Sequence, residues 1–194
     1  MPTMSQSEAA FCRSAPWRFV ARRMVLPWAL QDTRPGGDVL EIGAGGGAMA
    51  AELLATHPDI RVTVTDFDAT MVSAAEKRLA PFADRTTARQ ADATELPFGD
   101  DSFDFVLCWI MLHHTIEWEK ALAEAVRVTR PGGEVVGYDL LNTAPLRVLH
   151  QAEGARFRMM RFAELRETVR DLPVTQAILT PGLARFAVRF TLRK

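Results

Sequence analysis

The sequence predicts an α/β fold: a doubly wound sheet of seven strands, mostly parallel, with a reversed C-terminal strand. Three observations support this prediction. A strand-like run at 39–42 leads into four glycines within 43–47, and a helix-compatible run follows. Apolar runs then alternate with amphipathic runs, which is typical of a parallel sheet covered by helices on both faces. The last two strand-like runs are too closely joined for a parallel crossover, so we expect them to pair antiparallel.

Each element follows from hydrophobic periodicity and turn residues. We expect strands at 39–42, 61–65, 86–90, 103–108, 134–140, 175–180 and 185–192. We expect helices at 48–57, 69–79, 117–129 and 163–171, preceded by one or two helical turns within 15–31. Pro27 should kink or end the first of these turns, and Pro131-Gly132-Gly133 should end the helix before it. Residues 1–34 then form an N-terminal helical segment, and residues 35–194 form a single domain.

Composition and charge limit the function classes. The 194 residues carry a net charge of −1, which gives no overall attraction to nucleic acid. The charge is uneven: residues 1–34 hold five Arg against two acids, and residues 147–194 hold ten Lys and Arg against four acids. These basic ends either meet an anionic partner or form a solvated face. Two cysteines make no disulfide framework, and the apolar run 105–112 is too short to span a membrane. We expect a cytoplasmic protein with no stable membrane insertion.

Three acidic residues lie around the glycine run in a recognisable order. Glu41 precedes the glycines, which allow positive φ and close approach of a ligand to the backbone. Asp66 ends the second strand, where a carboxylate can accept hydrogen bonds from both hydroxyls of a ribose. Asp92 comes just after the third strand, where it can accept from the exocyclic amine of adenine. The pattern predicts a Rossmann-like fold that binds an adenosine-containing ligand.

These segments together resemble the class I S-adenosylmethionine-dependent methyltransferases, from about residue 37 to the C-terminus. The matching segments are Val39–Gly47, Val64–Asp68, Ala91–Phe98, Ser102–Leu107, Leu112–His114 and Arg130–Glu134. The Leu-His-His segment after the fourth strand is most similar to the branch that methylates quinone precursors and other small molecules. The reversed closing strand of the family agrees with the antiparallel pair expected above.

The resemblance implies S-adenosyl-L-methionine as methyl donor and S-adenosyl-L-homocysteine as product. It assigns the following contacts: Glu41 to the amino group; Gly43, Ala44 and Gly45 to the methionine part; Asp66 to the ribose; Phe67, Asp92 and Ala93 to the adenine; Cys108 and Trp109 to the border of the sulfonium and the acceptor. Structural alternatives stay open, because Glu41 could cap a helix, Phe67 could be core and Asp92 could be a turn residue.

His113 and His114 are the candidates for a general base, with Asp139 a weaker one. We expect these adjacent histidines to point to different sides, so that one at most faces the site. A structural role for both remains open. They lack metal-ligand spacing with cysteines or acids, so we expect no metal site. Cys108 is expected to be a buried thiol rather than a nucleophile.

The reaction implied is in-line displacement of the methyl group by an O, N or C nucleophile of a small, apolar or aromatic acceptor. Segments 11–31 and 141–161 would build the acceptor pocket, and because they are short a homodimer could complete it. The fourth strand lacks the Asn/Asp-Pro-Pro-aromatic pattern of base methylation, which disfavours nucleic acid. Two alternatives remain: a non-catalytic cofactor-binding partner or regulatory subunit, and an NAD(P)-binding oxidoreductase. Glu41 would repel a pyrophosphate, which disfavours the second.

Overall fold

One seven-stranded sheet organises the protein. The computed structural model describes residues 19, 21–31, 33–144, 157–182 and 186–194. The strands are β1 Asp38–Ile42, β2 Arg61–Asp66, β3 Thr86–Gln90, β4 Phe103–Trp109, β5 Thr129–Leu140, β6 Gln176–Gly182 and β7 Ala187–Arg193. The helices are η1 Ala21–Val25, α3 Leu26–Leu30, α4 Ala48–Thr56, α5 Ala69–Leu79, η2 Ala80–Arg85, η3 Leu112–His114, α6 Trp118–Val128 and α8 Phe162–Arg170.

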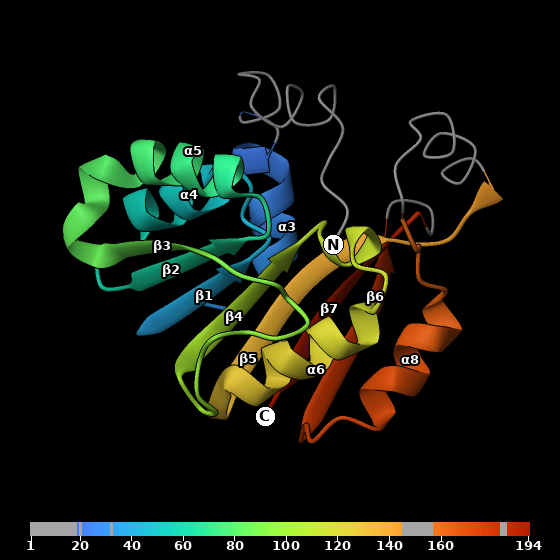
Figure 1. The fold of residues 1–194 in the computed structure, drawn as a ribbon. Helices are drawn as coiled ribbons and strands as arrows, with labels where there is room; N and C mark the ends of the chain where they lie inside the picture. Colours follow the sequence, from blue (N-terminus) through green and yellow to red (C-terminus); the bar gives the residue numbers. More distant parts are fainter. Residues whose placement is uncertain (1–18, 20, 32, 145–156, 183–185) are drawn as a thin grey trace.

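The helices cover the sheet in two layers. Helices α3, α4 and α5 lie on one face, and α6 and α8 lie on the other (Figure 1). Each layer buries its own apolar cluster against the sheet, one containing Leu107 and Val136 and the other containing Val106 and Val135. The side chains of consecutive strand residues therefore pack into the clusters on opposite faces of the sheet, as expected for strands buried on both faces. The predicted α/β architecture is confirmed.

The strand order is β3-β2-β1-β4-β5-β7-β6. Strands β3, β2, β1, β4 and β5 pair in parallel, and β7 is antiparallel to both β5 and β6. The predicted reversed C-terminal strand is thus confirmed, but it lies one position inside the sheet rather than at its edge. Burial explains this position: residues 187–190 of β7 are all buried, whereas residues 176–178 of β6 are all exposed.

Two predicted boundaries shift in the structure. Helix α6 ends at Val128, one residue before the predicted end at 129, and β5 begins at Thr129, before the Pro-Gly-Gly turn. The turn is an irregularity within β5, since pairing with β4 passes from Thr129 directly to Glu134, and Gly132 has a φ of 82°. Near the N-terminus, η1 ends at Val25 and Pro27 lies in the first turn of α3, where proline is well tolerated.

Parts of the predicted N-terminal and acceptor segments lie outside the described residues. These parts are residues 1–18, 20 and 32 of the N-terminal segment and residues 145–156 of the segment after β5. Within the described residues, no helix combines the length and the apolar character needed to cross a membrane.

Candidate cofactor and acceptor site

The candidate site lies at the carboxyl edge of the parallel strands. Strands β1 and β4 are neighbours, and the chain continues from them in opposite directions, to β2 and β3 on one side and to β5 on the other. Ligands of open α/β sheets bind outside such a switch point. The glycine run follows β1 and Trp109 ends β4, so the fold brings both predicted segments to this place.

The glycine loop combines tight packing with an open backbone. Gly43, Gly45 and Gly47 have φ values of 66°, 53° and 70°, a region that favours glycine. A Cβ at Gly43 would lie 2.7 Å from the Cβ of Met111, whereas a Cβ at Gly45 would meet nothing within 4 Å. Packing therefore requires glycine at 43, and the backbone at 45 borders open space where a ligand can approach.

Strand β2 and helix α5 fix the shape of this loop. The Ala44 N–H donates to the Thr65 carbonyl oxygen at 2.9 Å. On the other side, Arg78 of α5 donates to the Gly46 carbonyl oxygen at 2.6 Å. Arg78 was not among the predicted site residues, because no local motif marks a side chain that reaches across 32 positions.

Glu41 is a buried carboxyl at the end of β1, with 2 % of its surface exposed. Its Oε2 atom is buried and has no hydrogen-bond partner within the described chain. Burial, and then the charge of Asp66, raise the pKa of Glu41 to about 8, while a hydrogen bond from the Ala50 N–H opposes the shift. A buried polar atom without a partner requires an explanation, and a ligand cation beside Oε2 would provide one.

Asp66 ends β2 within reach of the glycine loop. Its Oδ2 accepts a hydrogen bond from the Gly45 N–H at 2.8 Å, and its Oδ1 accepts one from the Asp68 N–H at 2.9 Å. Burial raises the pKa of Asp66 against the effect of these bonds. The next residue, Phe67, is half-buried, and the Gln90 side-chain amide fixes its carbonyl oxygen at 2.9 Å.

Asp92 and Ala93 lie just after β3, separated from it by one residue. The Thr94 N–H and hydroxyl both donate to Oδ1 of Asp92 at 2.8 Å. Partial burial acts to raise the pKa of Asp92, but these two bonds hold it below its ordinary value. The half-buried carboxylate thus stays ionised beside the backbone of Ala93, whose side chain is in the core.

Helix α6 anchors the loop that carries Asp92. Glu124 accepts a hydrogen bond from the Leu96 N–H at 2.8 Å. Arg127 donates to the carbonyl oxygens of Phe98 and Leu96 at 2.9 and 3.2 Å, and pairs with Glu124 at 2.6 Å. Sequence reasoning missed this anchor. The one local signal for it is that Glu124 and Arg127 are three positions apart on a helix, a spacing that allows an ion pair.

Cys108 and Trp109 end β4 and point to opposite faces of the sheet, into separate core clusters. Cys108 is 1 % exposed, and burial raises the pKa of its thiol well above the usual range. A buried thiol of that kind is no nucleophile. Trp109 packs 5.6 Å from the Tyr138 ring, and its Nε1 atom is buried with no hydrogen-bond partner among the described residues.

The two histidines lie on the short helix η3, beside the end of β5. His113 is 1 % exposed, and its Nδ1 lies 2.6 Å from Oδ1 of Asp139. Asp139 also accepts from the N–H groups of Leu112 and Leu140, at 2.7 and 2.6 Å. His114 is half-buried, and its ring lies 4.0 Å from that of His113. The rings expected on different sides are therefore in contact, because a tight 3₁₀ turn brings them together.

The residues just after β5 and those from 158 to 160 lie beside these histidines. Leu141 forms a bridge with Met160, and the Arg158 N–H donates to the His113 carbonyl oxygen at 2.9 Å. Met159 and Met160, both predicted for the acceptor pocket, are buried. The stem of the predicted acceptor segment thus borders the histidine turn.

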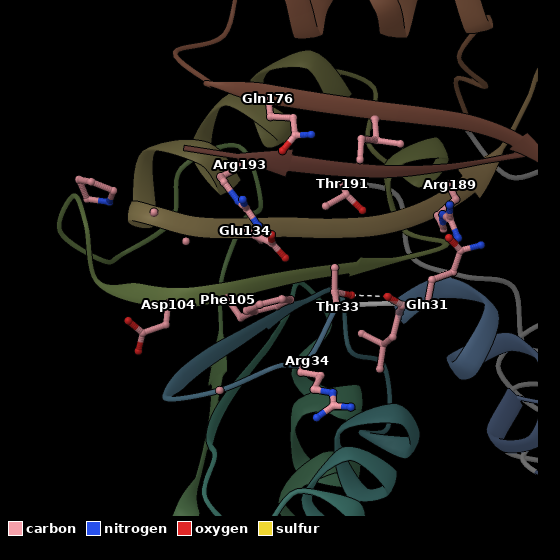
Figure 2. Close-up of a pocket in the computed structure, with 16 residues that line it drawn as sticks. Gln31, Thr33, Arg34, Asp104, Phe105, Glu134, Gln176, Arg189, Thr191 and Arg193 are labelled. Atoms are coloured by element: carbon pink, nitrogen blue, oxygen red, sulfur yellow. Dashed lines mark hydrogen bonds and ion pairs between the residues drawn. The ribbon is translucent and has the colours of Figure 1, made fainter.

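A cavity of about 770 Å³ opens elsewhere, at the amino edge of β4 and β5 (Figure 2). Its lining includes Asp104 and Phe105 at the start of β4, and Glu134 of β5. No residue of the glycine loop lines it. The groove runs from this edge along β7 to Arg189, which pairs with Tyr138 near the end of β5.

Comparison with known proteins finds methyltransferases among the similar sequences. A family model described as a methyltransferase domain matches residues 39–133. A demethylmenaquinone methyltransferase of Clavibacter sepedonicus is 39% identical over 120 residues, which cover 62% of this chain and 45% of that protein. A 27-O-demethylrifamycin SV methyltransferase of Amycolatopsis mediterranei is 37% identical over 126 residues, covering 63% and 46%. The chain thus spans less than half the length of these relatives.

Solved structures support the fold. The crystal structure of the PH0226 protein from Pyrococcus horikoshii superposes with a TM-score of 0.80 at 17% identity, covering 98% of this chain and 99% of that one. The strand order, the glycine loop after β1 and the matched methyltransferase domain are all consistent with the same fold. Over residues 39–133 the chain matches the methyltransferase domain, and it resembles the quinone-methyltransferase branch of the class I S-adenosylmethionine-dependent methyltransferases.

Proposed function

We propose that this chain transfers the methyl group of S-adenosyl-L-methionine to a small, apolar or aromatic acceptor. The observation that carries the proposal is the row of three carboxylates at one sheet edge. Glu41 lies near the end of β1, Asp66 ends β2 and Asp92 follows β3, and these three strands are successive neighbours in the sheet. A long ligand laid across these strand ends would meet the three carboxylates in order.

Each carboxylate suits a different part of the cofactor. The buried Oε2 of Glu41 would accept from the amino group, whose positive charge also favours the ionised form of the carboxyl. Asp66 would hold the ribose hydroxyls beside the loop that it already contacts. Asp92 would read the adenine edge together with the backbone of Ala93, and Phe67 would cover the ring.

The glycine loop and the end of β4 would hold the reacting end. Gly43, Ala44 and Gly45 would pass under the methionine part, and open space at Gly45 supports close approach. Cys108 and Trp109 would border the sulfonium. When bound, the cofactor supplies a methyl group that is already electrophilic. The protein then aligns the acceptor nucleophile for in-line attack and excludes water.

The histidine turn is the proposed source of a general base. Asp139 holds Nδ1 of His113 and so fixes the ring and its tautomer. The His114 ring lies against that of His113 at a tilt of 40°, and His114 is the more exposed of the two. One of them would take the proton of an acceptor hydroxyl or amine. An acceptor that reacts without losing a proton would not need them.

The acceptor class follows from the stem after β5 and from the relatives. Apolar side chains border the histidine turn, and the printed names of the two relatives refer to demethylmenaquinone and 27-O-demethylrifamycin SV. We therefore propose a small-molecule acceptor and no nucleic acid. Residues 1–34 would cap the acceptor side of a single domain at 35–194, a homodimer would complete the pocket, and the protein would act in the cytoplasm.

Binding calorimetry tests the cofactor. We expect S-adenosylmethionine and S-adenosylhomocysteine to bind, and NAD to bind far more weakly. Glu41→Gln and Asp66→Asn should each weaken S-adenosylhomocysteine at least tenfold, because each removes a charged hydrogen-bond acceptor. Exposed Glu76→Gln is the control. Tight NAD binding without binding of either sulfur compound would contradict the proposal.

Turnover separates an enzyme from a binding subunit. Methyl transfer from labelled S-adenosylmethionine should be sought with 1,4-dihydroxynaphthalene, 1-naphthol and a wider panel of phenols and amines. We expect products with ring-bearing acceptors. Binding of both cofactor forms without turnover on any acceptor would instead favour the non-catalytic alternative.

A further inference from the structure

Three buried side-chain atoms without a hydrogen-bond partner lie at the carboxyl edge of the sheet. Within the described part of the chain, the unpartnered atoms are Glu41 Oε2, Trp109 Nε1, Thr143 Oγ1 and Trp118 Nε1. Glu41 lies near the end of β1, Trp109 ends β4, and Thr143 is the third residue after β5. These three strands are neighbours, in the order β1-β4-β5. Because buried polar groups are normally paired, their concentration at this edge indicates a ligand that pairs with them.

The end of β4 is held in an unusual backbone conformation. Trp109 is 7 % exposed, and the next residue, Ile110, has a φ of 48°. A β-branched residue rarely adopts this region, and residues in such conformations are concentrated at functional sites. The Ile110 N–H donates to the Tyr138 carbonyl oxygen at 2.9 Å, and the rings of Trp109 and Tyr138 lie 5.6 Å apart. The indole is therefore fixed in place, although its own N–H has no hydrogen bond within the described chain.

Glu41 relates Trp109 to the proposed cofactor. In β1, Leu40 and Ile42 belong to the cluster under α6 and α8. The alternating side chain of Glu41 therefore faces the other layer, to which Trp109 belongs. The proposed cofactor lies across the ends of β3, β2 and β1, and β4 is the next strand. Trp109 thus lies beyond the amino-acid end of the cofactor, on the side where an acceptor would bind.

The chemistry of Trp109 and Thr143 is complementary to a hydroxyl group. An indole Nε1 can only donate a hydrogen bond, whereas a threonine hydroxyl can also accept one. Resting on the proposed methyltransferase function, we propose that these two residues determine specificity for the acceptor by binding one ring hydroxyl. Its oxygen accepts from Trp109 Nε1, and its hydrogen is donated to Thr143 Oγ1. The two residues orient the ring and take no part in proton transfer at the histidine turn.

Three naphthalenes separate the two hydrogen bonds. Their dissociation constants are measured by ligand-observed nuclear magnetic resonance, with the chain saturated with S-adenosylhomocysteine and with the chain alone. 1-Naphthol offers an oxygen and a hydroxyl hydrogen, 1-methoxynaphthalene offers only the oxygen, and 1-methylnaphthalene offers neither. We expect affinity to fall in this order, about 3- to 10-fold at each step, because each step removes one neutral hydrogen bond.

Matched variants assign each hydrogen bond to its residue. Relative to 1-methylnaphthalene, Trp109→Phe should weaken 1-naphthol and 1-methoxynaphthalene about 3- to 10-fold. Trp118→Phe makes the same change at a buried indole of α6 and should alter none of these ratios. Thr143→Val, of the same shape, should weaken 1-naphthol alone, and Thr143→Ser, which keeps the hydroxyl, should retain its affinity.

The indole signals of the ¹⁵N-labelled, unaltered protein give a second readout that does not depend on the folding of a variant. We expect 1-naphthol and 1-methoxynaphthalene to move the Trp109 indole N–H signal downfield of its position with 1-methylnaphthalene, because only the first two accept its hydrogen bond. The Trp118 indole signal should stay the same with all three compounds.

The proposal is overturned if the three naphthalenes bind equally or not at all, or if Trp109→Phe and Trp118→Phe have the same effect. It is also overturned if Thr143→Val weakens the ether as much as 1-naphthol. A loss of S-adenosylhomocysteine affinity in Trp109→Phe as large as the loss for 1-naphthol would assign the N–H to the cofactor instead. Failure of the proposed methyltransferase function would appear separately, as absent turnover, because these affinities are read without methyl transfer.

Discussion

Glu41 is a buried carboxyl that is expected to make stability depend on pH. Its pKa of about 8 lies above the ordinary value near 4.5, so the folded state retains a proton that the unfolded state loses. Stability is therefore greatest below pH 4.5 with respect to this group, and falls as pH rises to about 8. The loss reaches on the order of 5 kcal/mol. We expect Glu41→Gln to abolish this loss in urea unfolding at pH 5 to 9.

The control for this prediction is Glu76→Gln, which changes an exposed acid on α5. It should keep the pH dependence of the unaltered protein. A Glu41→Gln protein whose stability still falls between pH 5 and 8 by the same amount would show that another group causes the loss.

Asp139 is the second residue whose role can be measured. It accepts three hydrogen bonds while 1 % exposed, including the one that orients His113. Asp139→Asn replaces one acceptor oxygen by a donor, so we expect methyl transfer to a phenol to fall about 10- to 100-fold. The affinity for S-adenosylhomocysteine should stay unchanged. Equal losses in rate and in cofactor affinity would instead indicate a purely structural role.

At the scale of elements, the anchored loop after β3 yields a further prediction. Arg127 holds the carbonyl oxygens of Leu96 and Phe98, and so fixes the loop that begins at Asp92. Arg127→Met keeps the apolar stem but removes these bonds. We expect affinity for S-adenosylhomocysteine to fall about 3- to 10-fold and the Leu96 amide to exchange faster with solvent. Arg166→Met on α8 should change neither.

The sequence predicts the elements of this fold better than their contacts. Helix 69–79 and strand 86–90 have the predicted bounds, because periodicity and turn residues are local signals. The place of β7 between β5 and β6 depends on burial on both faces, which the hairpin alone does not reveal. The three carboxylates could be found because each lies at or just after the end of a strand. Arg78 and Arg127 could not, since their partners lie about thirty positions away.

At the scale of the whole molecule, the candidate site borders both cores. Cys108 belongs to the cluster under α6 and α8, and Trp109 to the cluster under α3, α4 and α5. A ligand at the end of β4 should therefore stabilise both clusters together, if residues 35–194 unfold as one domain. At 100 times its dissociation constant, S-adenosylhomocysteine should add about 2.7 kcal/mol to the free energy of unfolding. Amides of Val64 in β2 and Val135 in β5 lie in opposite clusters, and native-state hydrogen exchange should show both slowed about 100-fold. Protection confined to one of them would mean that the two halves of the sheet unfold separately, and that the single-domain proposal is wrong.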